Sequence, residues 1–162
     1  MTQVYYGTKR ITAVPKKKEF SRQISENPQR GEVYIQDGYA ITYEDGYQSW
    51  SPKEVFEAAY QPITAMSFGH AIKAAKDGNK IARAGWNGKN MFVVYMSALH
   101  LPPFNTQGTD RKVNDRTAKW IGEDKPLNSQ PYFAMYNAQE EWIVGWVASQ
   151  SDMLADDWMI VE

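Results

Sequence analysis

The side chains able to do chemistry in this sequence are mostly aromatic rings and hydrogen-bond donors. The chain contains 6 Trp, 10 Tyr and 6 Phe, but only two histidines and no cysteine. Disulfides, thiolate metal sites and cysteine nucleophiles are therefore absent. A serine or threonine nucleophile needs a base beside it, normally histidine. Neither His70 nor His100 has an oriented partner that the sequence identifies, so we expect no catalytic residue, metal site or cofactor, and hence no enzyme.

Adjacent carboxylates occur twice, as Glu140-Glu141 and Asp156-Asp157. Acid–base catalysis requires carboxyl groups that face the same reacting atoms. Neighbouring side chains on a strand or helix instead point in different directions. We expect all four carboxylates to be solvated.

Binding chemistry is better represented, and five of the six tryptophans lie in the last hundred residues. The tryptophans found there are Trp86, Trp120, Trp142, Trp146 and Trp158. A flat ring can stack on a nucleobase, which contributes roughly 1–3 kcal/mol per base in single-strand binders. Donors suited to phosphate or ribose are Arg83, Lys89, Ser149 and Gln150. This composition predicts a ligand pocket but does not identify the ligand.

The alternative is that the tryptophans form a hydrophobic core. Trp142 and Trp158 lie among strand-forming residues, so we expect both to be core residues. Trp86 lies in the turn at residues 85–88 (Gly-Trp-Asn-Gly), where an exposed aromatic ring is often a binding element. We therefore expect Trp86 to be accessible to a ligand.

Strands are predicted first among the elements that position these residues. Residues 4–14 alternate loosely between apolar and polar side chains. Two β-rich runs, residues 32–35 and 39–43, flank residues 36–38 (Gln-Asp-Gly). Asp-Gly is typical of hairpin turns because glycine tolerates positive φ, so we predict that these two runs pair with each other. Residues 44–46 (Glu-Asp-Gly) predict a second turn.

A helix should follow these strands. Residues 51–54 (Ser-Pro-Lys-Glu) place an N-cap serine, a proline and a glutamate as in a capping box. The residues on one face of this helix would be Val55, Phe56, Ala59 and Tyr60. Pro62 closes the helix, and residues 61–65 look like a linker. We therefore predict an N-terminal domain at residues 1–62.

The second predicted domain covers residues 66–162. Ser67 should cap a helix whose apolar residues repeat at helical spacing, and Gly78 should end it. Strands are predicted at residues 80–84, 90–96, 132–136, 142–147 and 158–161. Residues 99–129 form a long polar insertion, which is usually a functional loop or disordered. The predicted fold class is α+β: two small units with mainly antiparallel sheets, each with one main helix.

Net charge and hydropathy limit the partners. A net charge of -1 argues against a sequence-independent nucleic-acid polymer as partner, because such binders need many cations facing phosphates. No apolar stretch approaches the length of a membrane span. The Lys16-Lys17-Lys18 run is followed by polar sequence and is not a signal peptide. We expect a protein of the cytosol with no membrane partner.

Three blocks, taken together in order and spacing, resemble the second family of Thoeris anti-defence proteins. They are residues 66–72 (MSFGHAI), 82–89 (ARAGWNGK) and 145–158 (GWVASQSDMLADDW). The resemblance implies a phage or prophage protein in the cytoplasm of the bacterial host. It implies binding of the cyclic ADP-ribose isomer of Thoeris immunity, or of cyclic dinucleotides from another immune system, without cleavage. It also implies a homotetramer that holds the ligand between subunits.

The resemblance assigns roles residue by residue. It implies that Trp86 stacks on adenine, that Asn87, Ser149 and Gln150 form hydrogen bonds, and that Arg83 meets the pyrophosphate. The other candidate ligand-binding residues are Lys89, Phe92, Trp146, Asp152, Asn114 and Arg116. Ser149 and Asp152 also match a helix capping box, S-x-x-D, and both interpretations stay open. We predict that Trp86→Ala weakens binding more than tenfold while the fold survives.

Two departures from the compact family members leave other functions open. The insertion at residues 99–129 is longer than in those members, and its position suits a role in lining, extending or capping the pocket. The N-terminal domain is absent from them, although residues 49–56 resemble a segment common in phage-encoded proteins.

One rival hypothesis is a phosphodiesterase that degrades the same signal. The other is a phage structural or protein-interaction module with no nucleotide ligand.

Overall fold

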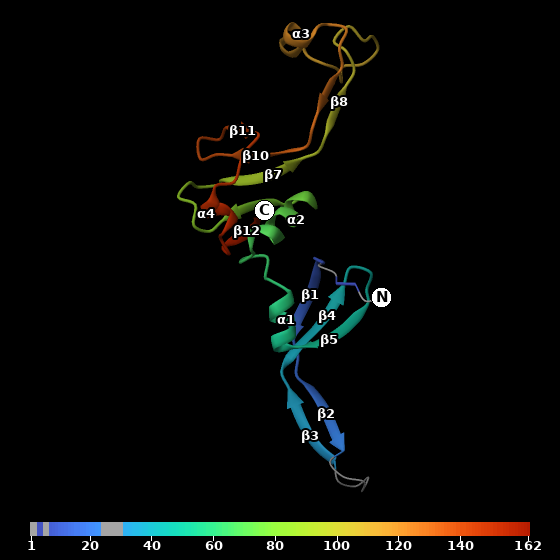
Figure 1. The fold of residues 1–162 in the computed structure, drawn as a ribbon, viewed down its shortest axis with the longest axis vertical. Helices are drawn as coiled ribbons and strands as arrows, with labels where there is room; N and C mark the ends of the chain where they lie inside the picture. Colours follow the sequence, from blue (N-terminus) through green and yellow to red (C-terminus); the bar gives the residue numbers. More distant parts are fainter. Residues whose placement is uncertain (1–2, 5–6, 24–30) are drawn as a thin grey trace. The chain divides into compact units, whose positions relative to one another are not determined.

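The structure, a computed structural model, describes residues 3–4, 7–23 and 31–162. The chain divides into two compact units, residues 1–62 and 63–162, which we describe separately. Each unit combines antiparallel strands with short helices (Figure 1). The predicted α+β fold class is therefore confirmed. No helix in the described part of the chain is long and apolar enough to cross a bilayer.

A long antiparallel ribbon forms most of the first unit. β1 (Ile11–Pro15) pairs with β4 (Gly38–Tyr43), and β2 (Lys18–Gln23) pairs with β3 (Gly31–Gln36). The register is the same in both pairs, so β4 continues β3 in the same direction and the two do not fold back on each other. The predicted hairpin between residues 32–35 and 39–43 is therefore wrong.

Gly38 explains this error. A Cβ at this position would collide with the carbonyl oxygen of Ser51 and with the ring of Trp50. Among the described residues, several glycines have a positive φ, but Gly38 is not one of them. The glycine thus allows a close approach of the backbone to a tryptophan ring, the second common use of this residue in strands.

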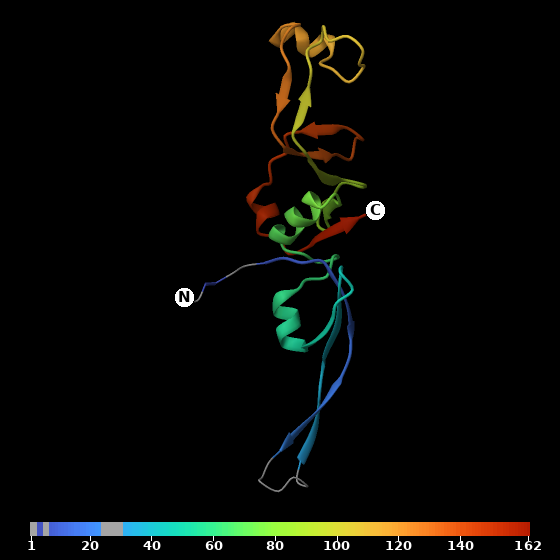
Figure 2. The ribbon, with the colours of Figure 1, turned by 90° about the vertical axis from the view of Figure 1, so that its right-hand side faces the viewer.

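The predicted turn at residues 44–46 is confirmed. It joins β4 to β5 (Gln48–Pro52), with Gly46 at φ 84° and its N–H donating to the Tyr43 carbonyl over 2.9 Å. The resulting sheet has the order β1-β4-β5. The helix α1 (Lys53–Ala59) follows β5 directly and lies on one side of this sheet (Figure 2).

The capping box predicted for α1 is wrong. Ser51 is paired with Tyr39 within the sheet, and Pro52 is the N-cap residue. Of the predicted helix face, Phe56 packs against the sheet, with its ring stacked on Tyr39 at 4.1 Å. Val55 is exposed. The helix is therefore positioned by ring packing and by its direct continuation from β5.

The second unit is a five-stranded antiparallel sheet with the order β11-β10-β7-β6-β12. Its strands are β6 (Lys80–Arg83), β7 (Phe92–Met96), β10 (Tyr132–Tyr136), β11 (Trp142–Val144) and β12 (Trp158–Val161). Beyond β12, the Met66 N–H donates to the Trp158 carbonyl over 2.7 Å. The predicted hairpin of β10 and β11 and the closing strand β12 are confirmed.

One face of this sheet packs on the helix α2 (Phe68–Lys76), which begins after Ser67 and ends before Gly78, at φ 95°, as predicted. The shared core contains Ala71 and Ala75 from the helix. It also contains Ile81, Val93, Met135 and Trp158 from the sheet. Trp158 is fully buried, which confirms that prediction.

The opposite face of the sheet carries an aromatic cluster. Phe92 stacks on Tyr136 at 5.2 Å, and Trp142 meets both rings edge-on. These residues alternate with the core residues along β7 and β10, so they point away from α2. Trp142 remains 49% exposed because β11 is an edge strand, so the prediction that it is a core residue is wrong.

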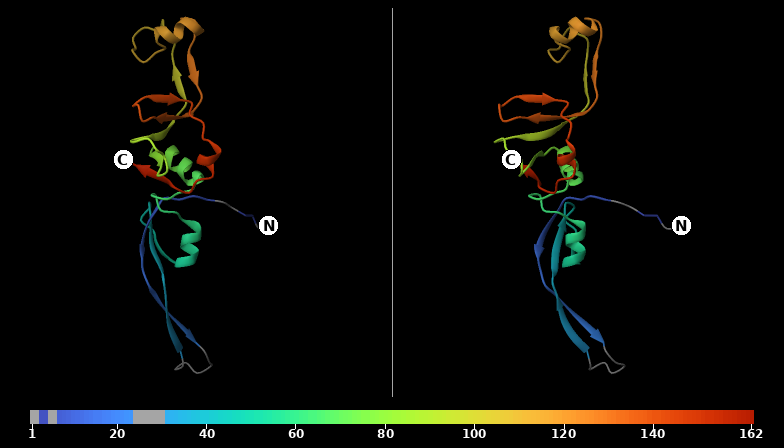
Figure 3. Two further views of the ribbon diagram at one scale, coloured as in Figure 1. Left: turned by 90° about the vertical axis from the view of Figure 1, so that its left-hand side faces the viewer. Right: turned by 60° about the vertical axis from the view of Figure 1, so that its left-hand side comes forward.

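The insertion at residues 99–129 is structured. β8 (Leu99–Leu101) pairs with β9 (Leu127–Ser129), and the helix α3 (Asp115–Ile121) lies between them in the chain (Figure 3). Val113 and Ala118 are buried and give this arm a small core of its own. The insertion is therefore not disordered, and its role as a functional loop stays a prediction.

Candidate functional site

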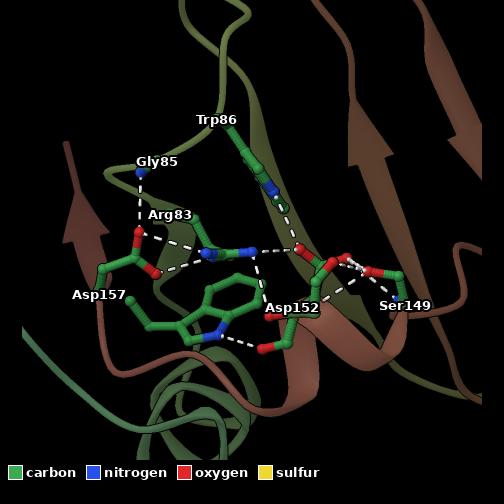
Figure 4. A network of polar contacts seen from close by, with 8 residues as sticks. Arg83, Gly85, Trp86, Ser149, Asp152 and Asp157 are labelled. Atoms are coloured by element: carbon green, nitrogen blue, oxygen red, sulfur yellow. Dashed lines mark hydrogen bonds and ion pairs between the residues drawn. The ribbon is translucent and has the colours of Figure 1, made fainter.

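The turn block and the C-terminal block meet where β6 pairs with β12. Arg83, the last residue of β6, lies opposite Trp158, the first residue of β12. The turn at residues 85–88 follows Arg83, and the helix α4 (Gln150–Met153) precedes Trp158. Strand pairing thus brings together two segments that are far apart in the chain (Figure 4).

Arg83 connects the two segments through its guanidinium. Its Nε donates to Asp157 Oδ1 over 2.7 Å, and its Nη1 donates to Asp152 Oδ1 over 3.0 Å. Further bonds run from Nη1 to the Ser151 carbonyl and from Nη2 to Asp157 Oδ2. A guanidinium has five N–H groups, so these four bonds occupy most of them. We call Arg83, Asp152, Asp157 and their partners Gly85, Trp86 and Ser149 the Arg83 network.

Asp152 is the most enclosed carboxylate of this network, with a side chain 12% exposed. Its Oδ1 accepts from Arg83 and from the Trp86 indole Nε1, the latter over 3.1 Å. Its Oδ2 accepts from the Ser149 backbone N–H over 3.1 Å and from the Ser149 hydroxyl over 2.6 Å. Burial by itself raises the pKa of Asp152, but the hydrogen bonds from Ser149, Arg83 and Trp86 outweigh it and lower the pKa to about 2.

Asp157 holds the start of the turn at residues 85–88 by a hydrogen bond. Its Oδ2 accepts from the Gly85 N–H over 2.8 Å, next to its two bonds with Arg83. The hydrogen bonds from Arg83 lower the pKa of Asp157, and the bonds to Asp157 and Asp152 raise the pKa of Arg83. A Cβ on Gly85 would lie 2.8 Å from the Asp157 carboxylate, so a larger residue there would require this ion-paired side chain to shift.

Trp86 is half-buried, and its accessibility to a ligand stays a prediction. Its ring meets Trp158 edge-on at 5.4 Å and Trp146 edge-on at 6.3 Å. Together with its bond to Asp152, these contacts make Trp86 part of the unit's packing. A loss of binding in Trp86→Ala would consequently reflect lost structure as well as any lost ligand contact.

The short helix α4 has the predicted capping box. The Ser149 hydroxyl accepts from the Asp152 N–H over 3.2 Å, while the Asp152 carboxylate accepts from the Ser149 N–H. Trp158 completes the fixation, because its Nε1 donates to the Asp152 carbonyl over 2.8 Å. Ser149 and Asp152 are thus firmly positioned by the chain itself.

The remaining predicted ligand residues fall into three places. Asn87, Lys89 and Gln150 are exposed around the Arg83 network, and Trp146 packs on its edge through Trp86. Phe92 belongs to the aromatic cluster on the sheet face away from α2. Asn114 and Arg116 lie on the arm, where Asn114 caps α3 by accepting from the Thr117 N–H over 2.8 Å.

Sequence reasoning missed Asp157, which it assigned to solvent together with Asp156. Asp156 is exposed as predicted, whereas Asp157 is ion-paired. Only the pairing of β6 with β12 places Asp157 next to Arg83, and no local sequence pattern predicts that pairing. Among the described residues, no group of three or more His, Asp or Glu side chains is placed to hold a metal ion.

Comparison with known proteins assigns the second unit. Residues 66–161 match the model of the Thoeris anti-defense 2-like domain. The Thoeris anti-defense 2 protein of Bacillus phage SP01 is 36% identical over 98 residues, which cover 60% of this chain and 97% of that protein. The matched region contains the whole Arg83 network and the arm, and it begins after the first unit.

Proposed function

The chain belongs to the Thoeris anti-defense 2-like family of phage anti-defence proteins. On this premise we propose that it sequesters a cyclic nucleotide immune signal in the cytoplasm of the infected cell. The ligand would be glycocyclic ADP-ribose of Thoeris, with cyclic dinucleotides as a further class. The signal would be held intact and kept from its effector.

The observation that carries the proposal is the fixed geometry around the Arg83 network. Arg83, which precedes the turn at residues 85–88, forms ion pairs with Asp152 of α4 at 3.0 Å and with Asp157 at 2.7 Å. The neighbouring exposed side chains, Asn87, Lys89 and Gln150, offer amide and ammonium donors. The Arg83 network holds the backbone that carries these donors before binding, so less of the chain has to be ordered by the ligand, which favours high affinity. A sponge with nanomolar affinity needs about -12 kcal/mol.

Within this proposal, Arg83 has a mainly positioning role. Its charge is balanced by two carboxylates, and most of its N–H groups are occupied. Direct contact between Arg83 and a pyrophosphate stays a prediction. Lys89 is a second candidate for this contact, because it is exposed and follows the turn.

The test is calorimetric titration of the full chain with glycocyclic ADP-ribose and a panel of cyclic dinucleotides. The complex is then denatured by heat and the released ligand is analysed. We expect tight binding and recovery of intact ligand. Recovery of a hydrolysed product would support the rival phosphodiesterase, and no binding at micromolar concentrations would reject the proposal.

Exposed residues give the sharper variants. Asn87→Ala and Gln150→Ala should each weaken binding at least tenfold without unfolding the protein, since neither side chain is buried. Lys76→Ala is the matched control, because Lys76 is an exposed residue at the end of α2. If all three variants bind equally well, the ligand does not lie at the Arg83 network.

Self-association is part of the proposal, as a homotetramer with ligand between subunits. β11 is an edge strand with exposed Trp142, Ile143 and Val144. Such an edge favours pairing with another chain. Light scattering should give the mass of four chains, and a monomer at micromolar concentration would reject this part of the proposal.

The alternative function is a phage structural or protein-interaction module. The observation that favours it is Trp120 on α3, which is 81% exposed on the structured arm. Exposed aromatic residues are enriched in protein interfaces. This alternative would replace sequestration if the calorimetric titrations showed no ligand.

A further inference from the structure

The first unit has an open sheet face that the family match does not include. α1 covers one face of the β1-β4-β5 sheet through Tyr39 and Phe56. The other face lines a cavity of about 500 Å³. Ligand pockets are typically about 300–1,000 Å³, so this space is large enough for one small ligand.

Strand alternation explains which side chains reach this cavity. The Lys16-Lys17-Lys18 run crosses from β1 to β2, and successive side chains of an extended chain point to opposite faces. Lys16 and Lys18 line the cavity. Lys17 points to the other face, where its Nζ lies 3.3 Å from Asp37. The lysine run is thereby divided into two cavity residues and one ion-paired residue.

Trp50 forms the aromatic part of the lining. Its Nε1 donates to the Lys16 carbonyl over 2.8 Å, which fixes the ring beside the first lysine. One side of the ring packs on Gly38. The Lys18 ammonium lies 5.4 Å from the ring centroid, on a flexible side chain that is able to move aside. Phe20 also meets the Trp50 ring, with the ring centroids 5.4 Å apart, so a flat ligand that displaces the Lys18 side chain would contact the indole beside Phe20.

The cavity is positively charged. Among the residues that the structure describes, its lining includes two lysines and neither aspartate nor glutamate. The floor is formed by small side chains, Val14, Ala40 and Thr42, so the space above the strands stays open. The hydroxyl group of Thr12 and the amide group of Gln48 add hydrogen-bonding partners. An anionic ligand with a flat ring complements this lining.

We propose that this face is a second ligand site, which binds a small free nucleotide with its base against Trp50 and its phosphates at Lys16 and Lys18. A nucleic-acid strand fits less well, because the positive charge does not continue along the ribbon. The next cation on this face, Arg22, lies opposite Glu32 in the register of β2 and β3. The site is separate from the Arg83 network and does not depend on the function proposed for it.

The test is titration of the full chain with ATP, followed by calorimetry and tryptophan fluorescence. The charge-removing double variant Lys16→Gln/Lys18→Gln should bind ATP at least tenfold more weakly than the wild type. Lys17→Gln is the matched control and should stay within twofold, since Lys17 faces Asp37. All three lysines are exposed, so the fold should survive in each variant, which circular dichroism checks.

The possible outcomes separate this site from the proposed sponge function. Loss of ATP binding in the double variant, with glycocyclic ADP-ribose binding unchanged, supports a second site. ATP binding that is unaffected by the double variant but lost in Asn87→Ala would place ATP at the Arg83 network and overturn the inference. No ATP binding by the wild type also overturns it, as does tighter binding of a twelve-residue oligodeoxythymidylate than of ATP.

Discussion

Replacing Asp152 by asparagine is the most direct test of the Arg83 network. The change keeps the shape of the side chain but removes its charge and one of its two acceptor oxygens. Four donors converge on this carboxylate, from Arg83, Trp86 and twice from Ser149. In either orientation, the amide NH₂ of Asp152→Asn would face donors where the wild type offers an acceptor.

The structure gives the magnitude. The pKa of Asp152 falls from its usual value of 3.8 to about 2, which corresponds to about 2 kcal/mol of stabilisation at neutral pH. Each buried donor left without an acceptor adds about 1–3 kcal/mol. The side chains of Asp152 and Arg83 are only 12% and 18% exposed, so solvent screens the pair little. We expect Asp152→Asn to lower the free energy of unfolding by about 3–5 kcal/mol.

The assay is thermal and denaturant unfolding followed by tryptophan fluorescence. Five of the six tryptophans lie in the second unit, so the signal reports mainly on that unit. For a unit of this size the midpoint should fall by about 10 °C or more. Because the folded-state pKa is depressed, the stabilisation by Asp152 is complete above about pH 4 and is lost as the pH falls towards about 2.

Wild type and Asp152→Asn should consequently differ less in stability at pH 2 than at pH 7. Asp156→Asn is the control, because Asp156 is an exposed carboxylate in the same segment. It should change the unfolding free energy by less than about 0.5 kcal/mol. A loss of less than 1 kcal/mol in Asp152→Asn, or a difference independent of pH, would refute the structural role assigned to the network.

Further predictions address single features of the fold. Ser149→Ala should cost about 1 kcal/mol in the unfolding free energy through loss of the α4 cap, measured by urea denaturation. Trp158→Phe should cost about 1–3 kcal/mol, since the ring is fully buried and its Nε1 bond is lost, measured by the same titration. Gly38→Ala should unfold or greatly destabilise the first unit, seen as loss of β-sheet circular dichroism, because a Cβ has no room beside Trp50. Trp120→Ser should leave the thermal midpoint within about 2 °C, as the ring is 81% exposed.

Local patterns in the sequence predicted much of the second unit correctly. The start and end of α2, the β10–β11 hairpin and the cap of α4 all follow from residues that are neighbours in the chain. The same approach failed at Gly38 and at Ser51. Each matches a local motif, but a contact with another strand decides its conformation.

The sequence by itself determined that five of the six tryptophans lie in residues 66–162, and its family resemblance grouped Arg83, Trp86, Ser149 and Asp152 as candidates for one site. Only the tertiary structure decided what these residues do for one another. The bond from Arg83 to Asp157 spans 74 positions and exists because β6 pairs with β12. Turn and cap signals arise between chain neighbours, whereas an ion pair of this kind depends on strand order. That order is favoured by burial of Ile81, Val93, Met135 and Trp158, from four different strands, in one core with α2.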